Sequence, residues 1–364
     1  MKNQRKNKRK HPVCLKGALM VLLCAVMMVC LPAKEARADV TQINTTEQLS
    51  WGKSYSGKIE NRVTQMYKYT IHLTESGHFG LVFNTSTVTA KIEIFDAAGN
   101  QLYEEYSAAG TTNHSLELLA GDYTLQVYRS GFEAPYLTFS FIPSFTASNE
   151  TQSESCSTQN NDTGLATSYT VGQSYTGHLA DNDNMDIYRL EVPKTGTIHV
   201  NLNSQLKSYS LDLVNNYGDV SYGQSEITSG AHQYSYFVPK GTYYLTIKQY
   251  SSQSTGTYTF RTSMSDMAGS KLKRVTNIRI NAMRVKWTKA AGVSGYQIQI
   301  ARDKNFKKGK LNFYVEDPSY TVQEIISLKR HKTYYVRVRN YVQLSNGKKY
   351  YSKWSNQKAV YIRK

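Results

Sequence analysis

Apolar and polar residues alternate along most of the chain after its first forty positions. A period of two places one face of a β-strand in a core and the other in water. Gly and Asn break these segments at turn positions, and no stretch of sustained helical periodicity follows. The pattern predicts an all-β protein of short strands in sandwiches or barrels. It is clearest in Lys91-Ile-Glu-Ile-Phe95, Tyr123-Thr-Leu-Gln-Val127, Ser210-Leu-Asp-Leu-Val214 and Tyr243-Tyr-Leu-Thr-Ile247.

The first 38 residues have the pattern of a secretory signal peptide. A Lys/Arg-rich stretch precedes an apolar run at 17–31, and Ala36 and Ala38 occupy the positions that a signal peptidase reads. The apolar run is shorter than the roughly 20 residues that a membrane span needs. We therefore predict cleavage after Ala38, export, and no membrane insertion of the mature chain. A lipoprotein is disfavoured, because neither Cys24 nor Cys30 follows a small residue.

Cysteine and charge change this picture in two ways. Only Cys156 remains after cleavage, so an internal disulfide cannot form and the domains must be held by their cores. Residues 39–269 hold 12 basic and 22 acidic side chains, whereas 270–364 hold 23 basic and 4 acidic ones. The mature protein thus joins an acidic part to a strongly basic one, and such asymmetry reports on partners or solubility rather than on fold.

The acidic part contains an internal repeat. The segment GKSYSGKI at 52–59 reappears as GQSYTGHL at 172–179. Four matches in order at one offset near 120 residues indicate duplicated domains, because solenoid repeats have much shorter periods. The other matching pairs are 67–71 with 188–192, 92–99 with 211–218, and 120–127 with 240–247.

Each copy resembles the bacterial pre-peptidase C-terminal domain, a jelly-roll-like β-sandwich of secreted proteins. The resemblance lies in the opening G-x-S-Y-x-G, in a Tyr-bearing strand after a polar turn, and in the late G-x-Y-x-L strand. It predicts one domain at 39–146 and a second at 168–265, and it implies an extracellular location rather than a particular chemistry. Residues 147–167 between them are mostly Ser, Thr, Asn and Gln, so we expect a flexible linker.

Residues 270–364 resemble a fibronectin type III domain, which has an immunoglobulin-like sandwich. Trp287 matches the buried tryptophan of the second strand, and Tyr296 points inward from the third. Tyr334 matches the corner tyrosine, whose hydroxyl returns to the backbone, and Arg337 and Arg339 are expected to point outward. The predicted fold is therefore three tandem β-sandwich domains after a signal peptide, in a monomer.

Motifs of catalysis are absent. The chain has no H-E-x-x-H, no G-x-S-x-G and no G-x-x-x-x-G-K-[ST]. The histidines of the mature chain are scattered over strand and turn positions and carry no local signature of a base or ligand. We therefore expect no enzyme and no catalytic residue.

One acidic segment is a candidate metal site. Asp181, Asp183 and Asp186, with two asparagines among them, offer oxygen ligands of the kind that Ca²⁺ prefers. It is not an EF-hand loop, since Val192 stands where that loop has its bidentate Glu. The alternative, which we favour from sequence, is a polar turn whose Asp and Asn bond their own backbone. No other cofactor is predicted, and the first copy lacks these acids.

Two surfaces suggest partners. Crowded tyrosines of the second copy are predicted to be strand residues with one wet end, with a carbohydrate platform as the alternative. The basic residues of 270–364 suggest attraction to anionic wall polymers, with a solvated lysine face as the alternative. Nucleic acid is not expected as a partner of an exported chain.

These observations predict a secreted, non-catalytic binding or adhesion protein of the bacterial cell surface or the extracellular space. Its expected partner is an extracellular protein, a cell-wall polymer or a polysaccharide. Because the last residues, 361–364, carry no anchor motif, we do not expect covalent anchoring to the wall, and the chain is expected to be secreted, with non-covalent association with the wall as a further option. The alternative is an accessory or targeting subunit of an extracellular hydrolase, a peptidase or glycosidase.

Overall fold

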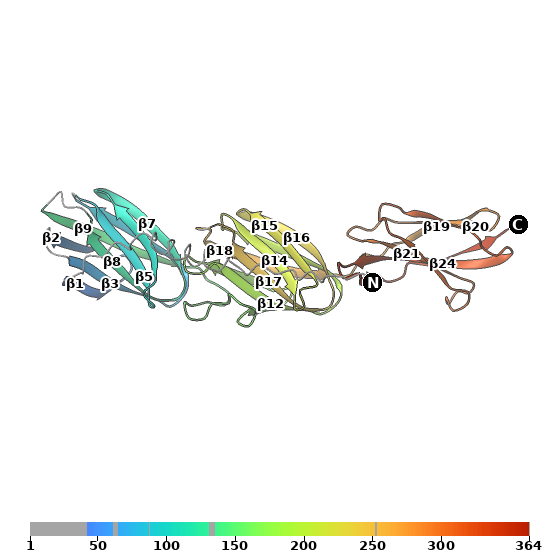
Figure 1. Ribbon diagram of the computed structural model, residues 1–364, viewed down its shortest axis with the longest axis horizontal. Helices are drawn as coiled ribbons and strands as arrows, with labels where there is room; N and C mark the ends of the chain where they lie inside the picture. Colours follow the sequence, from blue (N-terminus) through green and yellow to red (C-terminus); the bar gives the residue numbers. More distant parts are fainter. Residues whose placement is uncertain (1–41, 61–64, 87, 131–134, 252, 364) are drawn as a thin grey trace, which may run out of the picture.

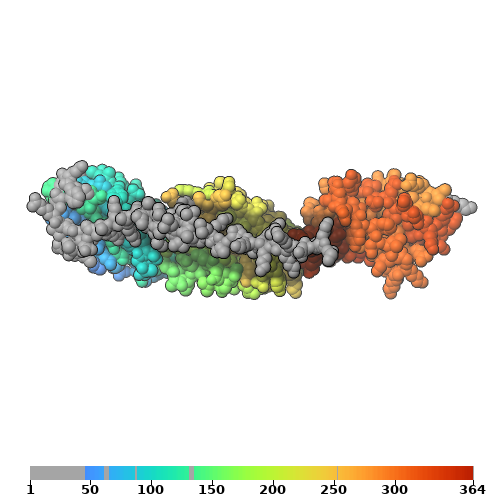
Figure 2. All heavy atoms as spheres, in the orientation of Figure 1, coloured from blue at the N-terminus to red at the C-terminus, as the bar shows by residue number. Residues whose placement is uncertain are grey.

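The computed structural model describes residues 42–60, 65–86, 88–130, 135–251 and 253–363. The predicted signal peptide lies outside these residues. The described chain contains twenty-six strands and no helix, which confirms the all-β class. Accordingly, no helix in it is long and apolar enough to cross a membrane. The strands form three sandwiches arranged in a row (Figure 1), visible as successive lobes in the space-filling view (Figure 2).

The first sandwich packs two sheets, with strand orders β1-β3-β8-β5-β6 and β2-β9-β4-β7. β1 pairs with β3 in parallel, and the remaining pairs are antiparallel. The strands are β1 (Gln42–Gln48), β2 (Tyr55–Glu60), β3 (Gln65–Leu73), β4 (Gly77–Thr85), β5 (Ala90–Asp96), β6 (Gln101–Ser107), β7 (Gly110–Leu118), β8 (Gly121–Arg129) and β9 (Tyr136–Ala147).

The second sandwich repeats the first strand for strand. Its sheets run β10-β12-β17-β14-β15 and β11-β18-β13-β16, and its first pair is again parallel. This identity of topology confirms the duplication predicted from the sequence repeat. The strands are β10 (Thr167–Tyr169), β11 (Ser174–Leu179), β12 (Met185–Val192), β13 (Gly196–Ser204), β14 (Tyr209–Asn215), β15 (Ser221–Ile227), β16 (Gly230–Val238), β17 (Gly241–Gln249) and β18 (Gly256–Ser265).

Aromatic rows hold these two cores. In the first, Phe83 stacks on Phe139 and Phe141 at centroid distances of 5.8 and 6.2 Å. In the second, Phe260 contacts Tyr188 at 4.7 Å. Phe83, Phe139, Phe141 and Phe260 alternate with more exposed residues along their strands, as the period of two requires. Each aromatic side chain buries a large apolar area, which compensates for the absence of an internal disulfide.

The third sandwich has one sheet in the order β19-β20-β23 and another in the order β22-β21-β24-β25, with β26 paired to β24. Trp287 is buried and meets Tyr296 edge-on at 5.3 Å. The Tyr334 hydroxyl accepts a hydrogen bond of 3.0 Å from the Lys329 N–H, which confirms the corner tyrosine. The strands are β19 (Leu272–Arg279), β20 (Ala282–Trp287), β21 (Gly295–Ala301), β22 (Leu311–Val315), β23 (Val322–Ile325), β24 (Lys332–Gln343), β25 (Lys349–Tyr351) and β26 (Lys358–Ile362).

Arg337 and Arg339 of β24 face outward, as expected, but they are not simply solvated. Both guanidinium groups lie 4.3 Å from the ring of Trp354, on which they stack. Arg337 also covers Phe306 at 4.1 Å, and Arg339 covers Tyr351 at 3.8 Å. Such cation–π contacts fix part of the positive charge of this domain within its own structure.

The segment 147–167 differs from the expected flexible linker. Its Thr151 N–H donates to the Thr176 carbonyl of the second sandwich at 2.9 Å, and the Cys156 N–H donates to the Ala120 carbonyl of the first at 3.0 Å. Glu154 is buried. The segment has too few apolar groups for a core of its own, but hydrogen bonds to both neighbours hold it in place.

Replacing Tyr334 by Phe is expected to lower the unfolding free energy of the third sandwich by about 1 kcal/mol, because one buried hydrogen bond is lost. Tyr361→Phe is the control, since the Tyr361 side chain is exposed. Urea denaturation followed by tryptophan fluorescence, to which Trp287 and Trp354 of this sandwich contribute, measures both variants. Equal stabilities would contradict the structural role of the Tyr334 hydroxyl.

Candidate metal centre between the first two sandwiches

Three carboxylates share one buried space at the junction of the first two sandwiches. Oxygen atoms of Glu154, Asp183 and Asp186 all lie within 4.8 Å of one another. The side chains come from the joining segment, from the turn before β12, and from β12 itself, and they are 7%, 3% and 1% exposed. The structure thus brings together two of the three aspartates singled out from the sequence and adds a glutamate that sequence reasoning missed.

The hydrogen bonds around the cluster leave oxygen atoms unused. Asn161 Nδ2 donates to one oxygen of Asp183 at 2.8 Å, and the Tyr258 hydroxyl donates to Asp186. The second oxygen of Asp183 and the side-chain oxygen of Asn161 are buried without a hydrogen-bond partner among the described residues. Buried polar atoms are normally paired with protein, water or an ion, so these two require an explanation.

The electrostatics of the cluster are unfavourable for ionised carboxylates. Burial, followed by repulsion from Asp183, raises the pKa of Glu154 to about 7. Burial raises the pKa of Asp183 to about 6, and burial together with the charge of Glu154 holds the pKa of Asp186 well above its usual range. Within the described chain, no Lys or Arg forms an ion pair with these groups. The cluster therefore lacks a compensating positive charge from the described residues.

The donor set suits a hard divalent cation. It offers carboxylate oxygens from three residues and an amide oxygen from Asn161, with no sulfur or nitrogen donor in the group. Calcium takes six to eight oxygen ligands of these types, whereas Zn²⁺ prefers Cys and His. Features of the polar turn are present too, since the Met185 N–H donates to Asp183 at 3.4 Å. That bond uses one carboxylate oxygen and leaves the other available.

Asp181 is placed elsewhere. One of its carboxylate oxygens accepts the Glu117 N–H of the first sandwich at 2.8 Å, and its own N–H donates to the Glu117 carbonyl at 2.7 Å. The neighbouring Asn182 accepts from the Leu119 N–H at 3.3 Å and donates to the Tyr123 hydroxyl at 3.0 Å. This turn therefore attaches the second sandwich to the first.

The joining segment reaches the cluster from the side of the first sandwich. The Glu154 carbonyl accepts a hydrogen bond of 3.2 Å from Ser76 Oγ, which itself accepts one from the Ala120 N–H. The backbone of Glu154 thus belongs to the first sandwich, while its carboxylate lies beside Asp183 and Asp186 of the second. A cation bound by all three would join the two domains.

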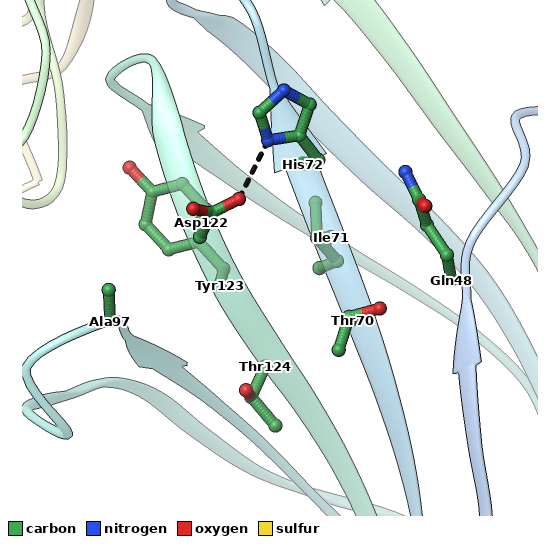
Figure 3. Close-up of a pocket in the computed structure, with 8 residues that line it drawn as sticks. All are labelled: Gln48, Thr70, Ile71, His72, Ala97, Asp122, Tyr123 and Thr124. Atoms are coloured by element: carbon green, nitrogen blue, oxygen red, sulfur yellow. Dashed lines mark hydrogen bonds and ion pairs between the residues drawn. The ribbon is translucent and has the colours of Figure 1, made fainter.

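Two other candidate sites, a hollow on the first sandwich and the tyrosines of the second, do not bring together a comparable set of buried polar side chains. A hollow of about 380 Å³ on the first sandwich contains an exposed ion pair of 2.7 Å between His72 and Asp122 (Figure 3). Among the described residues, no hydroxyl is hydrogen-bonded to that imidazole. The exposed pair therefore lacks the third member of a catalytic triad.

The tyrosines of the second sandwich do not form a flat exposed platform. Tyr243 and Tyr236 are buried, and Tyr236 stacks on Tyr222 at 4.8 Å and on Tyr234 at 6.3 Å. Tyr234 and Tyr236 lie opposite core residues of β13, so this row fills the edge of the sandwich. The arrangement favours strand residues with a wet end over a carbohydrate platform.

Comparison with known proteins supplies only structural neighbours. No family model and no curated protein matches the chain. Among solved structures, the pre-peptidase C-terminal domain of a collagenase from Bacillus anthracis is 19% identical and covers 27% of this chain and 94% of its own, with a TM-score of 0.24. A Fn3-like protein from Clostridium thermocellum is 16% identical and covers 28% and 97%, with a TM-score of 0.23.

The FN5 domain of Drosophila Lar is 18% identical and covers 26% of this chain and 95% of its own, with a TM-score of 0.21. Each match spans about one domain of this chain. The neighbours thus include both kinds of β-sandwich that the sequence resembles, a pre-peptidase C-terminal domain and fibronectin type III domains.

Without divalent cations, the protein is expected to lose stability as the pH rises from about 4 to about 7. The unfolded carboxylates have pKa values of about 4, whereas Glu154 and Asp183 have raised ones in the folded state, so the folded state binds more protons across this range. Calcium should abolish this loss of stability, because it binds the ionised carboxylates. Melting temperatures measured against pH in EDTA and in CaCl₂ test this, and identical curves would exclude a calcium site here.

Calcium is also expected to protect residues 147–167 from a broad-specificity protease. At a calcium concentration ten times the dissociation constant, cleavage through local opening should slow about tenfold. Glu154→Gln should lose this protection. Asp162→Asn should keep it, because Asp162 is exposed and bonds the Gly164 N–H within its own turn. If calcium still protects the Glu154→Gln variant from cleavage, Glu154 is not a ligand of the site.

Proposed function

We propose that the chain is a secreted, non-catalytic binding protein that attaches to anionic polymers of the bacterial cell surface through its third sandwich. The observation that carries this proposal is the charge of residues 270–364, with 23 basic and 4 acidic side chains. Summed charge of this size attracts polyanions over long distances and with low specificity. Wall polysaccharides that bear phosphate or carboxylate groups are the partners of this chemistry outside a cell.

The acids of this domain compensate little of that charge. Within the described residues, Glu324 alone pairs with basic side chains, and its partners are Arg279 and Arg284. Asp303 instead accepts backbone N–H groups of its own turn, including that of Lys307 at 2.9 Å. Asp317 accepts the Ser319 N–H at 2.8 Å. Most lysines of the domain therefore remain available to a partner.

The turn after β21 concentrates these lysines. Lys304, Lys307, Lys308 and Lys310 are all exposed. The Lys307 and Lys308 N–H groups both donate to the Asp303 carboxylate, which orders the turn without pairing the ammonium groups. The result is a compact cationic projection suited to a polymer with many negative charges.

The other two sandwiches support attachment without supplying charge for it. Their described residues belong to the acidic part of the chain, and hydrogen bonds such as those of Asp181 with Glu117 join them. In this proposal the mature chain is a monomer held non-covalently at the wall, and no residue acts as a catalyst. An accessory subunit of an extracellular hydrolase would require, in addition, a partner enzyme that co-purifies with it.

Retention of the mature chain on washed cell wall is expected to fall about tenfold or more when salt is raised from low to about 0.5 M, because exposed charges are screened. Replacing Lys304, Lys307, Lys308 and Lys310 by Gln should lower retention at low salt. The matched control replaces four exposed lysines of the second sandwich, Lys194, Lys207, Lys240 and Lys248. Retention that does not change with salt, or equal losses of retention in both variants, would refute attachment by the third sandwich.

A further inference from the structure

A buried histidine at the same junction lacks the partners that a buried imidazole needs. His178 on β11 is 2% exposed, and neither ring nitrogen has a hydrogen-bond partner among the described residues. The other deeply buried histidine, His114, has both nitrogens paired, with Tyr103 at 2.8 Å and Ser107 at 2.7 Å. A neutral imidazole carries one donor and one acceptor, so leaving both unpaired is costly.

The neighbours of His178 belong to the other sandwich. Its Nε2 lies 3.3 Å from one carboxylate oxygen of Glu117 on β7. The other oxygen of Glu117 lies 2.8 Å from Nδ1 of His78 on β4. Two imidazoles from two domains thus flank one carboxylate. Asp181 bonds both the N–H and the carbonyl of Glu117, which fixes the backbone of the central residue.

We propose that His78, Glu117 and His178 form a binding site for a divalent transition metal of the Zn²⁺ class. Zinc takes His nitrogen and Glu oxygen as ligands, and three protein ligands with a water in the fourth position form a common arrangement. Imidazole also suits Ni²⁺ and Cu²⁺, whereas calcium binds oxygen ligands. This site is therefore chemically distinct from the carboxylate cluster of Glu154.

The histidines differ in their freedom to move. The His178 ring is enclosed by the junction, whereas the His78 side chain is half exposed and can rotate. In this structure the two imidazoles flank the carboxylate, and the three residues are not among the described groups whose ligand atoms all lie within 4.8 Å of one another. Metal binding draws the His78 ring inward, with His178 and Glu117 as the fixed part of the site.

Burial of the site favours neutral imidazole ligands. Desolvation lowers the pKa of His178 to about 4, so this histidine is uncharged at neutral pH and its ring nitrogens are available to a metal. Burial also raises the pKa of Glu117. A cation would compensate the charge of this carboxylate. Since the ligands come from both sandwiches, a metal bound here would add a second link between them, beside the carboxylate cluster.

Titration of the full mature chain with ZnCl₂ in saturating CaCl₂, followed by calorimetry, tests the proposal. We expect one site, and at least a tenfold weaker affinity in both His78→Gln and His178→Gln. Glu154→Gln should leave zinc affinity unchanged. His72→Gln is the matched control, because His72 pairs with Asp122 at 2.7 Å in the same domain but has no second imidazole beside it.

The absence of zinc binding in the unchanged chain would overturn the proposal. Unchanged affinity in His78→Gln would do so as well, and this half-exposed position is not expected to affect folding. Equal losses in His72→Gln and His78→Gln would assign the zinc to scattered surface histidines. For His178→Gln, retention of the calcium-dependent melting temperature shows that the variant is folded, so that its loss of zinc affinity supports the site.

Discussion

Repulsion among three carboxylates in one buried space governs the junction between the first two sandwiches. Glu154, Asp183 and Asp186 cannot all be ionised there without a compensating charge, and no lysine or arginine of the described chain supplies it. A proton or a metal ion must do so. Because Glu154 is bonded to one domain through its backbone and faces the other through its carboxylate, an ion bound there would join the two domains.

Apolar cores stabilise the individual sandwiches, whereas polar contacts hold the first two sandwiches together. Three clusters of buried apolar residues hold the sandwiches, and the buried members of each come from a single domain, while Leu344 of the third sandwich packs against the second cluster. The first junction is instead formed by polar contacts, such as those of Asp181 with Glu117. Apolar cores respond little to ions, whereas buried polar contacts respond strongly. The fold can therefore stay constant while the coupling between its first two domains follows the surrounding solution.

The sequence predicted the fold better than the site, for a physical reason. Strand alternation, the duplicated motifs and the positions of Trp287 and Tyr334 depend on local pattern, and the structure agrees with them. Glu154 stands in a polar segment that looks fully solvated until two domains enclose it. Asp181 and Asp183 are two residues apart and chemically identical, yet one binds the first sandwich and the other lies in the cluster. The backbone conformation of the turn alone places these two carboxylates at different sites.

Two arginines of the third sandwich and the lysines after β21 have different environments, because their charged groups differ in chemistry. Arg337 and Arg339 stack on Trp354, because a planar, weakly hydrated guanidinium packs well on an aromatic face. Lysine ammonium groups are strongly hydrated point charges on flexible stems, and those after β21 remain in solvent. Arg337 and Arg339 therefore contribute to the structure of the domain, and the lysines after β21 contribute to its external field. A partner held by such lysines is selected by charge density rather than by shape, which fits a polymer better than a folded protein.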